Sequence, residues 1–168
     1  MDNILSWIIW IPVMGMVAIA FIPREKQDLI KKVAAVTTGV QLLLAIVLWS
    51  IFDATIGSFQ FMERAEWIPS LGISYILGID GLSLPMVALN ALIAFLGVFV
   101  SWNIDRAVKG YFALFLLLDT GVMGVFLSLD FFLFYVFWEV MLLPMYFLIG
   151  MWGGPQREYA AIKFFLYT

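Results

Sequence analysis

The sequence contains neither cysteine nor histidine among its 168 residues. Without them the chain cannot form disulfides, hold zinc through cysteine or histidine, or ligate an iron–sulfur cluster or a histidine-bound haem. Histidine is also the side chain that most readily exchanges protons near neutral pH, so proton chemistry here must use other groups. We therefore expect no cofactor-binding and no metal-binding residues in this chain.

Charged residues are scarce as well, at 12%, whereas 64% of the residues are hydrophobic and the mean hydropathy is +1.04. Soluble domains contain roughly 45–50% apolar and about 25% charged residues. A soluble domain of this length cannot bury so much apolar surface. No basic patch is evident, so we expect no nucleic-acid partner. The chain is predicted to lie in a lipid bilayer.

Long apolar runs predict the fold class, because a helix needs about 20 such residues to cross the hydrocarbon core. They indicate an all-α polytopic integral membrane protein with five complete transmembrane helices and the start of a sixth, in a single membrane domain over 1–168. The sixth run rises only about 15 Å, so we expect this chain to be the N-terminal part of a longer protein. The predicted spans are 3–22, 33–52, 82–102, 111–129, 131–151 and, incompletely, 159–168.

Basic residues predict the orientation, because they concentrate in loops on the cytoplasmic or matrix side. Seven lie in alternate connections, and only Arg64 lies on the other side, which predicts an external N-terminus. The seven are Arg24, Lys26, Lys31, Lys32, Arg106, Lys109 and Arg157.

The long external loop, 53–80, contains a pattern of its own. Between Pro69 and Gly81, apolar residues recur at every second position. This period predicts a short extended segment, such as half of a hairpin. The alternative is an interfacial loop folded onto the helix ends.

Two carboxylates interrupt the predicted spans, Asp119 in the fourth and Glu139 in the fifth. A charge at the bilayer centre costs about 2.5–3.5 kcal/mol, and such residues normally point into the helix bundle and have a function. Glu139 shares one helix stripe with Tyr135 and Tyr146, so hydroxyl groups lie one turn before it and two turns after it. This arrangement favours a proton-relay site at Glu139. The alternative is a buried anchor that hydrogen-bonds to another helix.

Asp119 and Lys163 are further candidates for proton transfer. The short turn between their spans places Asp119 and Glu139 within about 3 Å in depth, so they either share a proton or face apart. Lys163 either extends its side chain to the interface or pairs with a carboxylate and takes part in transfer. Other polar residues in the spans are expected to hydrogen-bond between helices; they are Thr37, Thr38, Gln41, Asn90 and Ser101.

Three stretches of the sequence resemble a known family. They are Gly78–Pro85, Asp130–Gly154 with its Phe-Trp-Glu-Val-Met-Leu-Leu-Pro-Met-Tyr core, and Ala161–Thr168. All three are similar to the antiporter-like membrane subunits of respiratory complex I, most closely to the M-type subunits of bacterial NADH:quinone oxidoreductase.

The resemblance implies an antiporter-like fold of about fourteen helices that translocates protons. Glu139 matches the family's glutamate on the fifth helix and Lys163 matches a lysine of the sixth, whereas Asp119 belongs to no matched motif. It also implies an enzyme subunit without redox chemistry of its own, since NADH, FMN, iron–sulfur clusters and quinone bind elsewhere in the complex. The implied partners are lipid, neighbouring antiporter-like subunits and other membrane-arm subunits, in a bacterial inner membrane rather than a mitochondrial one.

Two alternative functions remain open from the sequence. One keeps the fold, in a subunit of a cation/proton antiporter or of a membrane-bound hydrogenase. The other is a non-transporting scaffold subunit of the membrane arm.

Overall fold

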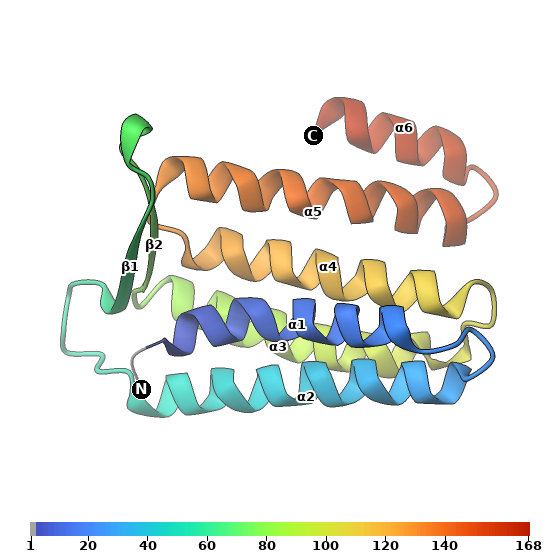
Figure 1. Ribbon diagram of the computed structural model, residues 1–168, viewed down its shortest axis with the longest axis horizontal. Coiled ribbons are helices and arrows are strands. Elements are labelled where there is room, and N and C mark those ends of the chain that lie inside the picture. Colours follow the sequence, from blue (N-terminus) through green and yellow to red (C-terminus); the bar gives the residue numbers. More distant parts are fainter. Residues whose placement is uncertain (1–2) are drawn as a thin grey trace.

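The computed structural model describes residues 3–168 as a helix bundle with one β-hairpin across one end (Figure 1). Helices α1 to α5 are each long and apolar enough to cross a bilayer. The expected all-α polytopic fold is confirmed, and the chain is a multi-pass membrane protein. The elements are α1 (Ile4–Phe21), α2 (Gln27–Ile51), β1 (Gln60–Ile68), β2 (Ile73–Ile79), α3 (Ser83–Val100), α4 (Val108–Leu127), α5 (Phe131–Trp152) and α6 (Arg157–Tyr167), with short 3-10 turns at Pro69–Leu71 and Ser101–Asn103.

Helix α2 begins at Gln27, six residues before the predicted start of its span. The extra turns contain charged residues, which a search for apolar runs excludes. Lys31 in these turns is buried. Its Nζ atom donates to the carbonyl oxygen of Trp102 at 2.7 Å and lies 3.9 Å from a carboxylate oxygen of Asp105. The charged start of α2 is therefore held against the α3–α4 connection.

The long 53–80 connection, which was predicted to be external, contains an antiparallel hairpin of β1 and β2. The extended segment predicted before Gly81 is β2. Its partner β1 was not predicted, because four of its nine residues are polar or charged and no clear alternation marks it. The backbone N–H of Leu129 donates to the carbonyl of Ile76 at 2.9 Å. This bond fastens β2 to the corner between α4 and α5.

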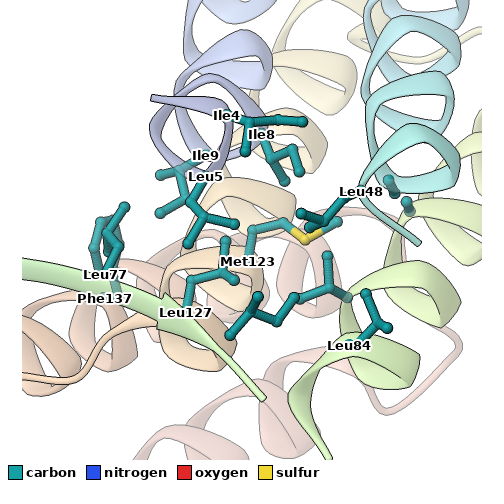
Figure 2. Packing of buried hydrophobic residues seen from close by; sticks show 14 of the residues in the cluster. Ile4, Leu5, Ile8, Ile9, Leu48, Leu77, Leu84, Met123, Leu127 and Phe137 are labelled. Carbon is teal, nitrogen blue, oxygen red and sulfur yellow. The ribbon is translucent and has the colours of Figure 1, made fainter. Parts of the chain in front are cut away.

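Helix α4 lies at the centre of the bundle, where it packs against α1, α2, α3 and α5. Gly121 lets α5 come close, because a Cβ atom at this position would lie 2.9 Å from the Cα atom of Met141. Near the hairpin, α1, α2, β2, α3, α4 and α5 all contribute to one apolar cluster (Figure 2). Its labelled members are Ile4, Leu5, Ile8, Ile9, Leu48, Leu77, Leu84, Met123, Leu127 and Phe137.

Candidate proton-transfer sites in the membrane

Glu139 lies on an exposed face of α5, so the described bundle does not bury it. The hydroxyl of Tyr135, one turn earlier on the same stripe, neighbours the Glu139 carboxylate. Within residues 3–168, neither a hydrogen bond nor an ion pair joins Glu139 to another helix. Its proton-relay role stays a prediction, and the alternative of an anchor bonded to another described helix has no support here.

Helix α6 packs on the side of α5 that bears Glu139. The rings of Tyr146 and Phe165 have centroids 5.6 Å apart, and a Cβ atom at Gly150 would lie 3.6 Å from that of Ala161. The two helices are thus antiparallel, and a residue four positions earlier in α5 lies opposite a residue four positions later in α6. Glu139 lies seven residues before Tyr146, whereas α6 ends two residues after Phe165, about midway along α5 (Figure 1). The Glu139 stripe therefore extends past the described end of α6.

Lys163 projects from α6 between two tyrosines and is exposed. Its Nζ atom lies 5.6 Å from the ring centroid of Tyr159 and 5.9 Å from that of Tyr167. Among the described residues, no carboxylate oxygen lies within 4.0 Å of it. The structure does not bring Lys163 and Glu139 together, and participation of Lys163 in transfer stays a prediction.

Asp119 is buried inside the bundle, with 4% of its surface exposed. Its Oδ1 atom accepts a hydrogen bond of 2.7 Å from Nδ2 of Asn90 on α3. The side chain of Gln41 on α2 lies beside the same carboxyl group, and its Nε2 atom donates to the carbonyl of Ile8 at 3.1 Å. Within the described chain, Oδ2 of Asp119 and Oε1 of Gln41 are both buried without a hydrogen-bond partner. The expected interhelical bonds of Asn90 and Gln41 are present.

A cavity of about 350 Å³ lies beside Asp119, between α3, α4, α5 and α6. Its wall is apolar except for Asn90, Asp119 and Thr168, and it includes Trp138 and Met141 but not Glu139. Since Gly121 lies opposite Met141, Asp119 and Glu139 differ in depth by about 6 Å. Of the two arrangements left open by the sequence, the structure shows the one in which the carboxylates face apart.

Glu63 is a buried carboxylate that the sequence analysis missed, since it lies in the external loop. It is 8% exposed and accepts hydrogen bonds from the backbone N–H groups of Leu5 at 2.8 Å and Ser6 at 3.1 Å. The first turn of α1 carries the positive end of the helix dipole. A register shift in β1, where Phe61 has a φ of 52°, precedes Glu63 and redirects the strand. Glu63 therefore fastens the hairpin to α1.

Tyr75 extends this contact between the hairpin and α1. Its hydroxyl lies 3.0 Å from the Ser6 hydroxyl and accepts a hydrogen bond of 3.2 Å from the indole nitrogen of Trp10. Burial raises the pKa of the Tyr75 hydroxyl. The phenol therefore stays neutral and serves as a hydrogen-bonding group between the hairpin and α1.

Comparisons with known proteins identify chains that are similar to this one. The family described as "NADH:quinone oxidoreductase/Mrp antiporter, TM" matches residues 128–168, which include α5 and α6. The chain is 35% identical over 165 residues to NAD(P)H-quinone oxidoreductase chain 4 1 of Nostoc sp.. It is 40% identical over 166 residues to NADH-ubiquinone oxidoreductase chain 4 of Arabidopsis thaliana. Each alignment covers 98% of this chain.

The chain is a relative of the antiporter-like subunits of NADH:quinone oxidoreductase. It superimposes on a chain of respiratory complex I from Thermus thermophilus with a TM-score of 0.82 and 25% identity, over 97% of this chain and 32% of that one. A chain of an archaeal membrane-bound sulfane sulfur reductase shares the fold, with a TM-score of 0.79, 22% identity and coverage of 98% and 34%. The chain spans about one third of the length of the curated relatives it matches, 31% and 34% of the two named above.

Proposed function

We propose that this chain is part of a proton-translocating membrane-arm subunit of an NADH:quinone oxidoreductase, with Glu139 as its charge-coupling carboxylate. The observation that carries the proposal is the stripe of Tyr135, Glu139 and Tyr146 on α5, which is exposed at Tyr135 and Glu139 and covered by α6 at Tyr146. A carboxylate that faced lipid would raise the free energy of the folded protein and form no compensating contact. A second helix packed on that stripe would turn it into the wall of a polar path.

The position of α6 supports the idea that a second helix covers the Glu139 stripe. This helix already packs on the Glu139 side of α5 at Tyr146 and Gly150, and the matched relatives are about three times as long as this chain, so we propose that a further helix covers the rest of the stripe. A cationic side chain placed opposite Glu139 would bind its proton more tightly while the carboxylate is charged and near, and less tightly once that carboxylate is neutralised or moves away. Movement of charge along the membrane arm would then be coupled to release or uptake of that proton.

The proposed orientation follows from the two ends of the bundle. The α1–α2, α3–α4 and α5–α6 connections lie at the end opposite the hairpin (Figure 1), and they carry the basic side chains, such as Arg24, Arg106 and Arg157. Basic loops stay on the cytoplasmic side. We place the hairpin and the N-terminus outside, in a bacterial inner membrane, with the other membrane-arm subunits as partners. NADH, FMN, iron–sulfur clusters and quinone are proposed to bind elsewhere in the complex.

The test measures proton pumping and quinone reduction in the reconstituted complex that contains this chain, with Glu139→Gln or Glu139→Ala. A relay group that holds a proton in transit contributes roughly 10²–10⁴ in rate, so we expect pumping to fall at least about tenfold. Glu158→Gln is the matched control, since Glu158 lies exposed at the first turn of α6. Near-normal pumping in both Glu139 variants would defeat the proposal.

Native gels of the same membranes separate this function from a scaffold role. A scaffold residue would reduce the amount of assembled complex, whereas a relay residue would leave assembly intact and reduce pumping per complex. Loss of assembly in Glu139→Gln, together with normal pumping per assembled complex, would favour the scaffold.

A further inference from the structure

The deepest carboxyl group of the bundle has an unusual set of neighbours. Asp119 uses one oxygen to accept from Asn90, and its other oxygen, Oδ2, is buried without a partner in residues 3–168. The neighbouring Gln41 has the same feature, because its Oε1 atom is also buried and unpaired there. Two oxygen acceptors on adjacent side chains cannot satisfy each other, and buried polar groups without partners cost about 1–3 kcal/mol each.

Rotating the Gln41 amide by half a turn, which would exchange its nitrogen and oxygen, does not satisfy all of these groups. Its nitrogen already donates to the carbonyl of Ile8, and a turned amide would put an oxygen against that carbonyl. Asn90 donates from its amide nitrogen to Oδ1 of Asp119, so Oδ1 already serves as an acceptor. A hydrogen atom on Oδ2 of Asp119 would give this carboxyl group a donor for the unpaired oxygen of Gln41.

No cation near Asp119 takes the place of that hydrogen. Helices α1 and α3 contain no charged residue, and Lys31 of α2 lies ten residues before Gln41 and binds Trp102. Lys109, the other charged residue of α4, donates to carbonyls of α1 at its far end. Asp28 and Lys32 lie with Lys31 in the first two turns of α2, and Arg157 and Glu158 lie in the first turn of α6. Tyr75 of β2 binds Ser6, and Tyr111 of α4 binds Ser101. On α5, Tyr135 and Glu139 are exposed and Tyr146 packs against Phe165, and Lys163 of α6 lies between Tyr159 and Tyr167.

We infer that Asp119, Asn90 and Gln41 form a proton-binding site, in which Asp119 carries the proton on Oδ2 and donates it to Oε1 of Gln41. A neutral carboxylic acid supplies one donor and one acceptor, which matches the acceptor on Gln41 and the donor on Asn90. A cavity of about 350 Å³ between α3, α4, α5 and α6 has Asp119 and Asn90 in its wall, so the site adjoins this cavity. This inference does not depend on the role of Glu139.

A bound metal cation fits these residues less well. Hard cations take six or more oxygen ligands, whereas the cavity wall offers only three polar side chains, and the described residues contain no cluster of three metal-binding side chains. The chemical class of the ligand is therefore a single proton.

Infrared difference spectroscopy of the full-length protein in membranes tests the site. At neutral pH the wild-type protein should show the C=O stretching band of a protonated carboxylic acid, and Asp119→Asn should lack it. Gln41→Leu should keep the band and shift it to higher frequency, because the acid loses its acceptor. Glu139→Gln is the control that should leave the Asp119 band unchanged.

Thermal unfolding in detergent gives a second measurement. Asparagine reproduces the donor and the acceptor of the protonated acid, so Asp119→Asn should keep the unfolding midpoint, whereas Asp119→Leu should lower it by leaving Asn90 and Gln41 unpaired. A wild-type band of ionised carboxylate at Asp119, with or without added sodium, would overturn the inference. So would a Gln41→Leu spectrum identical to that of the wild type. Neither result depends on proton pumping, so it leaves the proposed function untouched.

Discussion

Helices α4 and α5 each carry one carboxylate in the middle of the membrane, at depths about 6 Å apart, yet the two side chains lie in different surroundings. Helix α4 is enclosed by α1, α2, α3 and α5, so Asp119 is buried between two amides. Helix α5 forms an edge that α6 covers in part, so Glu139 is exposed. The place of a helix in the bundle, more than its composition, decides whether a carboxylate is enclosed by other helices or lies on an open edge.

We expect the largest effect on stability from a substitution that forces α4 and α5 apart. Gly121 allows the backbones of α4 and α5 to touch, and a side chain there would meet the Cα and N atoms of Met141 at 2.9 Å. Backbone atoms cannot move aside as a flexible side chain can. Gly121→Val should therefore lower the free energy of unfolding by about 3 kcal/mol, measured by denaturant titration in detergent micelles.

Gly110→Val on the same helix is the matched control. The nearest atom to a Cβ at Gly110 is in the side chain of Trp152, at 3.9 Å, so the bundle should accept the larger residue there. Equal stabilities for the two valine variants would show that the close approach of α4 and α5 is not needed.

A second substitution tests how hydrogen bonds stabilise a buried carboxylate, by comparing Glu63 with Asp119. Glu63, in the hairpin, accepts from two backbone amides at the start of α1, whereas Asp119 accepts a hydrogen bond from the side-chain amide of Asn90. Glu63→Ala should lower the unfolding free energy by about 2 kcal/mol, because charged hydrogen bonds and the helix dipole are both lost. The exposed Glu66 on the same strand provides the control, and Glu66→Ala should leave stability unchanged.

Loss of stability in both alanine variants would mean that strand β1 itself, and not the Glu63 contact, had been weakened. Protection of the first α1 amides from hydrogen exchange should decrease in Glu63→Ala alone. This second readout follows the contact directly, since the amides of Leu5 and Ser6 are its donors.

Much of the architecture follows from hydropathy. Each long apolar run became a helix, and the period of two before Gly81 became strand β2. These patterns suffice because a helix or strand in lipid must satisfy its own backbone, so a local signal fixes a local structure. Strand β1 has no such signal, since its mixed side chains are mostly exposed and its register with β2 is irregular.

The surroundings of the carboxylates could not be predicted in the same way. Helices α4 and α5 are apolar on all sides, so neither sequence indicates which face is covered. The burial of Asp119 depends on Gln41 and Asn90, which lie on helices distant in the sequence and were read as packing residues. Glu63 became buried through a strand irregularity at Phe61. Contacts between distant segments decided each case.

The smallest effect should come from a carboxylate that remains in contact with water. Asp80 precedes α3, and its Oδ1 atom accepts from the backbone N–H of Ser83 at 2.8 Å and of Leu82 at 3.1 Å. Hydrogen bonds from Ser83 lower the pKa of Asp80. A lowered pKa in the folded state stabilises the protein above the ordinary aspartate pKa of about 3.9, and this contribution is lost as the pH falls through the lowered value.

Asp80→Asn should remove this acid-range dependence and keep the hydrogen bonds to the start of α3. Solvent screening limits the difference to about 0.5 kcal/mol, so it should appear as a small divergence between the two unfolding curves below about pH 4. Curves that stay parallel through the acid range would contradict the role assigned to Ser83. Because Asp80 remains hydrated, this variant separates the effect of hydrogen bonds on a carboxylate from the effect of burial, which the two carboxylates in the membrane combine.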